Sequence, residues 1–231
     1  DALGTKKSIG YFRALSTEGV LSMSPSVVIA SDKAGPPDVV KALKASAVPF
    51  IEIDDRPEPG MLLARVSAVA AAVDRTEQGA ALAARLRADF AQLEEQRRRI
   101  GTPVRALFIL GVQSGRILVG GRNTAADAMF ALAGARNVAA AIDGFKPMTE
   151  EMLIALDPEA IVTMTRSSGP SVQAELRSVQ GVMASTAGRT ARFIEMDALF
   201  LMGFGPRAPA AARELMERLH AGAAPKAATV R

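Results

Sequence analysis

The sequence predicts an α/β protein built as two lobes joined by one long helix. Strand-like apolar runs alternate with helical patterns along most of the chain, which favours parallel sheets covered on both faces. In the middle, residues 76–100 form one long amphipathic pattern, with apolar residues at helical spacing from Leu82 to Leu93. We therefore expect two Rossmann-like lobes with parallel sheets, one before this helix and one after it.

A third observation is that a short segment occurs twice. Residues 17–30 and 150–163 each hold a glutamate, two apolar residues starting two positions later, a proline and then an apolar strand. Glu18 and Glu151 are separated by the same 133 positions as the two prolines. This spacing is too long for a solenoid repeat. We interpret it as one α/β unit used once in each lobe.

Turn-forming residues set the expected element boundaries. Strands are expected at residues 27–30, 48–53, 104–110, 116–119, 160–164 and 192–196. Helices are expected at residues 38–46, 61–73, 76–100, 124–133 and 208–221. The chain then divides into an N-terminal lobe over 1–75, an interdomain helix over 76–100, a C-terminal lobe over 101–221 and a flexible tail over 222–231. The N-terminal lobe reaches the first repeat copy almost at once, so we expect it to be incomplete at its start.

The composition excludes several classes of protein. The chain has 231 residues, of which 49% are hydrophobic and 23% charged, as in a globular protein with a sizeable core. It has no cysteine, which excludes disulfides, thiolate metal sites and a cysteine nucleophile. No apolar run is long enough to span a bilayer. The net charge is +4, but with one tyrosine and no tryptophan the chain does not resemble a nucleic-acid binder, and anionic ligands or an anionic membrane surface fit better.

The residues do not assemble an evident catalytic set. We find no Ser/His/Asp combination, no cluster of metal ligands and no paired carboxylates at a predicted cleft. The glycine-rich stretch at residues 120–124 could suggest a phosphate site, but it lacks the lysine of a Walker motif. An enzyme on a two-lobed α/β scaffold is therefore a less favoured hypothesis. A passive interaction module, with no ligand between the lobes, is a third.

Four short segments resemble the haem-binding proteins of bacterial haem ABC importers. They are residues 9–13 (Ile-Gly-Tyr-Phe-Arg), 34–37 (Ala-Gly-Pro-Pro), 124–128 (Thr-Ala-Ala-Asp-Ala) and 201–207 (Leu-Met-Gly-Phe-Gly-Pro-Arg). With the repeat and the long helix, the resemblance runs from Ile9 to His220. These proteins belong to the periplasmic binding proteins with a rigid interdomain helix, a class shared with cobalamin and siderophore binders. The resemblance implies a monomeric periplasmic protein that captures haem between its lobes and delivers it to an inner-membrane ABC permease. Binding of cobalamin or an iron siderophore is the alternative.

The resemblance also implies that Tyr11 is the axial ligand of the haem iron. A phenolate is a hard, anionic oxygen donor that suits ferric haem. A free phenol has a pKa of about 10, so phenolate binding needs the iron itself or a nearby cation. Arg13 would supply that charge if the segment is extended, because positions i and i+2 then share a side. The alternative is a tyrosine that packs at the edge of a lobe.

A second axial ligand is not evident. Some members of the family carry a histidine just after the strand expected at residues 104–110, but residues 111–114 read Gly-Val-Gln-Ser. The only histidine, His220, is expected on the surface of the last helix. We therefore expect five-coordinate ferric haem, or haem with water as the sixth ligand.

The haem propionates are carboxylates and are expected to pair with cationic side chains. Arginine binds carboxylates best because its guanidinium is planar and permanently charged. Arg13 and Arg207 are the first candidates. Lys33 and Arg166 follow, since they lie in loops after strands, although a plain surface charge is the stronger alternative for both. Met202 and Phe204 are expected to line the apolar part of the pocket.

The repeated glutamates have a separate implied role. In the family, one glutamate on each lobe forms salt bridges with arginines on the two permease subunits, and Glu18 and Glu151 match those positions. Two acidic residues at pseudo-symmetric sites suit a partner with two-fold symmetry. The helix dipole alone also favours a glutamate in a first turn. Glu150 lies beside Glu151, so the sequence leaves open which of the two docks. Release is expected when the permease spreads the lobes.

Overall fold

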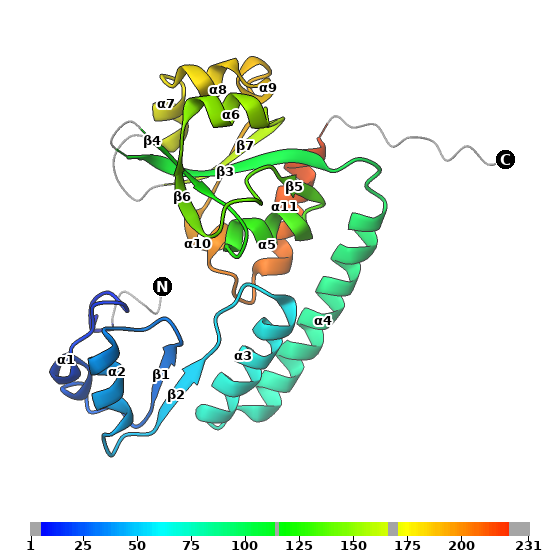
Figure 1. The fold of residues 1–231 in the computed structure, drawn as a ribbon. Coiled ribbons are helices and arrows are strands. Elements are labelled where there is room, and N and C mark those ends of the chain that lie inside the picture. The colour runs from blue at the N-terminus through cyan, green and yellow to red at the C-terminus, as the bar shows by residue number, and fades with distance from the viewer. Residues whose placement is uncertain (1–5, 114–115, 166–170, 222–231) are drawn as a thin grey trace. The chain divides into compact units, whose positions relative to one another are not determined.

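The computed structural model describes residues 6–113, 116–165 and 171–221, and the chain divides into two compact units (Figure 1). Unit 1 comprises residues 1–56 and 60–84, and unit 2 comprises residues 57–59 and 85–231. Helix α4 (Thr76–Arg98) begins in unit 1 and ends in unit 2. The predicted α/β class with one long helix between two sheets is confirmed. The lobe boundaries at residues 75 and 100 stay predictions, and the expected tail over 222–231 lies outside the described residues.

Unit 1 contains a two-stranded parallel sheet. Its elements in chain order are α1 (Thr17–Leu21), β1 (Val28–Ser31), α2 (Pro37–Lys44), β2 (Phe50–Ile53) and α3 (Pro59–Ala72). Helix α2 begins at Pro37, because proline lacks the N–H that the first turn leaves unpaired anyway. The two strands pair from Val28 with Phe50 to Ser31 with Ile53, so both strands end at the same edge of the sheet.

Helices α3 and α4 pack very closely in unit 1. A Cβ atom built on Gly79 of α4 would lie 2.2 Å from the Cβ of Ala70 in α3. Real carbon atoms do not approach so closely, so this crossing requires glycine at position 79. The sequence predicted both helices but not this contact, because no local pattern indicates that positions 70 and 79 lie close together.

Unit 2 is built on a mixed sheet. Its strands are β3 (Val104–Gln113), β4 (Arg116–Gly120), β5 (Ala135–Asn137), β6 (Phe145–Met148), β7 (Ala160–Met164) and β8 (Phe193–Met196). The order is β6-β4-β3-β7-β8, with β5 also paired to β3. Strands β7 and β8 run parallel to their neighbours as expected, and β5, which was not predicted, also pairs in parallel with β3. Strand β4 is antiparallel to both β3 and β6.

The antiparallel strands β4 and β6 are present in addition to the predicted parallel strands. Only two residues separate β3 from β4, and a parallel crossover needs a dozen or more. Strand β6 was not predicted because Pro147 cannot donate to a sheet. The structure accommodates this proline because β6 is an edge strand.

Helices cover both faces of the unit 2 sheet. They are α5 (Ala125–Leu132), α6 (Glu150–Leu156), α7 (Val172–Leu176), α8 (Gln180–Ala184), α9 (Thr186–Arg189), α10 (Ala198–Met202) and α11 (Ala208–His220). Figure 1 shows α6 to α9 on one face and α5, α10 and α11 on the other. The core under α6 to α9 includes Leu107, Leu153 and Ile161, all with no exposed surface. Within the residues described, no helix is both long and apolar enough to cross a membrane.

Candidate ligand site and docking surface

Tyr11 lies on a tight turn at the surface of unit 1. Its backbone carbonyl accepts a hydrogen bond of 2.8 Å from the N–H of Ala14, which closes the turn. The Tyr11 side chain is 59% exposed, and its ring packs edge-on against Phe12 with 5.0 Å between the ring centres. The phenol is therefore held on an ordered backbone while most of the side chain faces solvent. This arrangement makes the Tyr11 side chain accessible to a ligand from solvent.

The loop before α2 fixes this turn. Gly35 donates its N–H to the carbonyl of Phe12 at 3.0 Å and accepts a hydrogen bond from the N–H of Leu15 at 2.9 Å. A Cβ on Gly35 would lie 3.5 Å from the carbonyl oxygen of Arg13, so the two backbones are in van der Waals contact. The segments at residues 9–13 and 34–37, which the resemblance singled out separately, thus form one structural unit.

Arg13 does not follow the geometry expected from an extended segment. Residues 11–14 form a turn, so positions 11 and 13 do not share a side as they would in a strand. The guanidinium of Arg13 instead lies over the ring of Phe12, with 5.1 Å between its central carbon and the ring centre. Tyr11, Phe12 and Arg13 therefore form one exposed aromatic and cationic group, held together by edge-on and cation–π contacts.

Lys33 already has a partner. Its ammonium pairs with the carboxylate of Asp55, which also accepts a hydrogen bond of 2.7 Å from the hydroxyl of Ser31. Burial alone would raise the pKa of Asp55, but the hydrogen bonds from Lys33 and Ser31 outweigh it and lower that pKa. The carboxylate thus stays ionised and neutralises the lysine. This favours the alternative in which Lys33 is a structural charge at the end of the parallel sheet.

The other predicted ligand residues described in the structure lie in unit 2. Arg207 is exposed, and its guanidinium carbon lies 5.5 Å from the centre of the Phe200 ring. A cation–π contact of this kind leaves N–H groups of the guanidinium able to donate to a carboxylate. Met202 is half-buried at the end of α10, whereas Phe204 is only 3% exposed and occupies the position of a core residue. Arg166 lies outside the described residues.

The sequence did not indicate that the apolar residue Leu199 is exposed. Leu199 of α10 is 66% exposed, although it belongs to an apolar run that reads as core. A Cβ on Gly203 would lie 2.4 Å from the carbonyl oxygen of Leu199, so the turn that ends α10 requires glycine there. The only sequence signal was the length of the run, which exceeds what so short a helix can bury.

The glycine-rich stretch before α5 packs against the rest of unit 2 and does not form a phosphate site. A Cβ on Gly121 would lie 2.1 Å from the carbonyl oxygen of Ile142, which explains why glycine stands there. The hydroxyl of Thr124 donates to the Gly121 carbonyl at 2.7 Å and accepts from the N–H of Asp127 at 3.2 Å. Thr124 is thus the N-cap of α5. Among the described residues there is also no group of three or more His, Asp or Glu side chains that could hold a metal ion.

The two repeated glutamates occupy equivalent helical positions. Glu18 is the second residue of α1, and Glu151 is the second residue of α6. Each helix is capped by a hydroxyl: Ser16 accepts from the N–H of Gly19 at 3.0 Å, and Thr149 accepts from Met152 at 3.3 Å. Both glutamates are exposed. The duplication seen in the sequence therefore extends to the helix caps.

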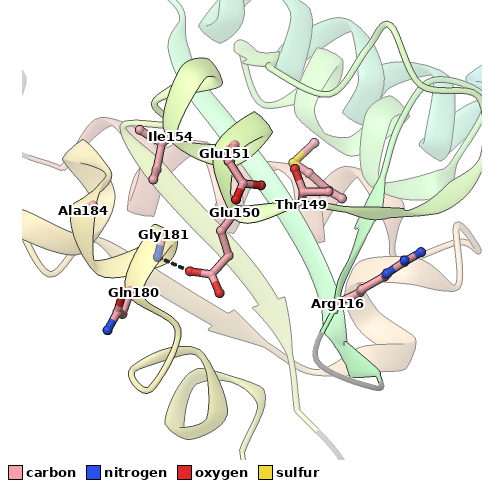
Figure 2. A pocket seen from close by; sticks show the side chains of 9 residues that line it. Arg116, Thr149, Glu150, Glu151, Ile154, Gln180, Gly181 and Ala184 are labelled. Atoms are coloured by element: carbon pink, nitrogen blue, oxygen red, sulfur yellow. Dashed lines mark hydrogen bonds between the residues drawn. The ribbon is translucent and has the colours of Figure 1, made fainter.

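The adjacent glutamates Glu150 and Glu151 have different surroundings in the structure (Figure 2). Glu150 is half-buried, and its carboxylate accepts a hydrogen bond of 2.5 Å from the backbone N–H of Gly181. Glu151 is exposed, and hydrogen bonds from its own backbone N–H and from the Thr149 hydroxyl lower its pKa. Glu151 is therefore the member of the pair that presents an ionised carboxylate to solvent.

His220 is held by unit 2 at the end of α11. Burial lowers its pKa, while contacts with the carbonyls of Ala133 and Gly134 act in the opposite direction. Because the folded pKa lies below the unfolded one, the unfolded chain binds more protons in the window between the two values. The contribution of His220 to the stability of the fold is therefore complete at neutral pH and decreases as the pH drops below about 6.5.

Replacing His220 with glutamine is expected to flatten the pH dependence of stability between about pH 7 and pH 5. Glutamine keeps a hydrogen-bond donor for the nearby carbonyls but has no proton to gain. Urea unfolding of both proteins across this range measures the effect. A wild-type protein whose unfolding midpoint stays constant below pH 6.5, or a variant with the same slope as wild type, contradicts the assignment.

The chain shares its fold with several proteins of known structure. It is 37% identical to the periplasmic heme-binding protein BhuT, solved with two hemes, covering 96% of this chain and 85% of that one with a TM-score of 0.89. It is 34% identical to the periplasmic heme-binding protein RhuT from Roseiflexus sp. RS-1, covering 96% and 85% with a TM-score of 0.87. A periplasmic heme-binding protein from Pseudomonas aeruginosa is 30% identical, covering 97% and 82% with a TM-score of 0.85.

A curated relative is more distant. The substrate-binding lipoprotein YvrC of an uncharacterised ABC transporter in Bacillus subtilis (strain 168) is 23% identical over 209 residues. This match covers 89% of the chain, which spans 65% of the length of that relative.

The chain forms two α/β units, and one long helix begins in the first unit and ends in the second. This organisation agrees with the class of binding proteins that the resemblance implied. The model of the family described as periplasmic binding protein matches residues 1–199, and the chain belongs to this family. The family and the similar structures are binding proteins associated with transport rather than enzymes.

Proposed function

We propose that the protein is the haem-binding component of a bacterial ABC importer, which takes up haem in the periplasm and delivers it to an inner-membrane permease. The observation that carries this proposal is the likeness to three periplasmic heme-binding proteins, each at least 30% identical over 96% or more of the chain. The exposed group of Tyr11, Phe12 and Arg13 supports it, because a phenolate oxygen is a suitable ligand for ferric iron and the same turn carries an aromatic ring and a guanidinium.

Tyr11 is proposed as the axial ligand of the ferric iron. The turn that carries it is fixed by two backbone hydrogen bonds to Gly35, so little ordering of the backbone is needed when the iron binds. Arg13 is proposed to stabilise negative charge at this site, and Arg207 to bind a propionate through its N–H edge. Lys33 is the weaker candidate because Asp55 already neutralises it.

Glu18 and Glu151 are proposed to dock on the two subunits of the permease. They occupy the same position of equivalent capped helices, one in each unit, and both are exposed. Two matched carboxylates suit a partner that presents two matched cations, as a two-fold symmetric permease does.

An absorption titration of the purified protein with haemin tests the proposed function. We expect a shifted and sharpened Soret band that saturates at a fixed ratio of haem to protein. Parallel titrations with cyanocobalamin and with a ferric hydroxamate siderophore are expected to give no binding. An unchanged haemin spectrum together with binding of either other ligand would overturn the haem assignment in favour of the alternative.

A further inference from the structure

The turn that carries Tyr11 is held by hydrogen bonds more than by packing. It borders an apolar cavity of about 230 Å³, which is lined in part by Phe12, Leu15 and Ala34. The side chain of Phe12 is also 39% exposed, so it is not enclosed by the fold. The backbone of Gly35 forms the two hydrogen bonds that hold Phe12 and Leu15. The position of the turn therefore depends on what fixes the loop before α2.

The other end of this loop is tied to Asp55, which lies two residues after the end of β2. The hydroxyl of Ser31 donates to the Asp55 carboxylate at 2.7 Å and accepts from the N–H of Lys33 at 3.0 Å. The ammonium of Lys33 pairs with the second oxygen of the same carboxylate. The N–H of Ala34 donates to the Ser31 carbonyl at 2.9 Å. The contacts of Asp55 thus extend along the loop to the residue before Gly35.

Asp55 is itself anchored to the parallel sheet. Its N–H donates to the carboxylate of Asp32 at 3.3 Å, and the N–H of Asp32 donates to the carbonyl of Ile53 at 2.9 Å. Ile53 is the last residue of β2 and pairs with Ser31 at the end of β1. The Asp55 side chain is only 28% exposed. A continuous set of hydrogen bonds therefore runs from the end of the sheet, through the loop, to the turn that carries Tyr11.

We propose that Asp55 is a positioning residue for Tyr11, because it fixes the loop that holds the ligand turn. The inference rests on the proposed function, since it concerns how the phenol is presented to the haem iron. A loop that is ordered before haem arrives loses less conformational freedom on binding. Groups that orient a metal ligand without touching the metal contribute about 10-fold to 100-fold to affinity.

The alternative role for Asp55 is only to neutralise Lys33, and it predicts the opposite effect of the same substitution. Asp55→Asn keeps the size of the side chain and removes its charge. If Asp55 only neutralises the lysine, the freed ammonium can pair with a haem propionate and haem binds more tightly. If Asp55 positions the turn, the released loop lets the turn move and haem dissociates faster.

The dissociation rate of haem from Asp55→Asn, Lys33→Met and the double variant tests the proposal. Each protein is loaded with haemin and mixed with an excess of apomyoglobin, which traps the released haem. The phenolate-to-iron charge-transfer absorption reports the bond to Tyr11, and urea unfolding of the apo proteins reports stability. Glu52→Gln is the matched control, because it removes the ion pair of 2.6 Å that joins β2 to Lys44 of α2 in the same unit.

We expect Asp55→Asn to speed haem dissociation about tenfold and to weaken the charge-transfer absorption. The double variant should release haem no faster than the faster single variant, because both substitutions break one contact. Glu52→Gln should remain within about twofold of wild type. If Asp55→Asn does not fold, Ser31→Ala replaces it, since it removes another hydrogen bond to the same carboxylate and should also speed dissociation.

Slower or unchanged dissociation from Asp55→Asn, or from Ser31→Ala in its place, would overturn the positioning role. Equal acceleration by Glu52→Gln would also overturn it, because any lost ion pair of the sheet would then have the same effect. Wild-type protein that fails to bind haemin contradicts the proposed function. Wild-type protein that binds haemin, together with variants that release it at the wild-type rate, contradicts only this inference.

Discussion

Replacing Tyr11 with phenylalanine is expected to lower the affinity for ferric haem by about 100-fold or more and to abolish the phenolate-to-iron charge-transfer absorption. The substitution removes one oxygen atom and keeps the ring. The chain has no second tyrosine and no cysteine that could take over as an anionic ligand. Removing groups that merely orient a metal ligand costs about 10-fold to 100-fold in affinity, so removing the ligand itself should cost at least as much.

Competition titration with a haem-binding reference protein measures the affinity, and absorption spectroscopy reports the iron ligand. Tyr11 is 59% exposed, so the thermal unfolding of the apo variant should match that of wild type. Phe12→Leu removes the neighbouring aromatic ring and leaves the phenol, so we expect it to keep the phenolate-to-iron charge-transfer absorption even where the lost ring contact lowers the affinity. A Tyr11→Phe protein with an unaltered haem spectrum would exclude Tyr11 as the ligand.

The fold could be predicted from the sequence wherever the signal was local. The long helix was placed within two residues of its observed end at Arg98, and the buried strands β3 and β7 read directly as apolar runs. Strand β6 was missed because Pro147 argues against a strand, and only its place at the edge of the sheet makes it acceptable. Its neighbour in the sheet lies almost thirty residues earlier in the chain, so no short window contains the evidence.

The candidate site shows the same limit. The type of residue at position 11 and the position of the repeated glutamates could be read from the sequence. The orientation of Arg13 could not, because it depends on a turn that is closed by Ala14 and held by Gly35. The choice between Glu150 and Glu151 depends on Gly181, which is about thirty residues further along the chain. Contacts between distant segments decide which of two similar side chains is committed to the fold.

Replacing both Glu18 and Glu151 with alanine is expected to stop haem delivery while leaving haem binding intact. Each carboxylate is exposed and lies in a different unit, so neither is needed to build the core. Each single substitution should weaken permease binding about tenfold, and the double substitution about 100-fold, because contributions from sites without shared partners add in free energy. Haem transport into proteoliposomes that contain the permease measures delivery, and haemin titration measures loading.

Glu77→Ala is the matched control for the glutamate pair. Glu77 is exposed and is the second residue of α4, so its removal costs the same favourable interaction with a helix N-terminus. If Glu18 and Glu151 are present only because a helix start favours an acidic residue, all three substitutions should affect stability slightly and delivery not at all. If the pair docks, Glu77→Ala should transport like wild type while the double variant fails. A double variant no weaker than either single one would mean that only one unit contacts the permease through its glutamate, and the symmetric arrangement would then be wrong.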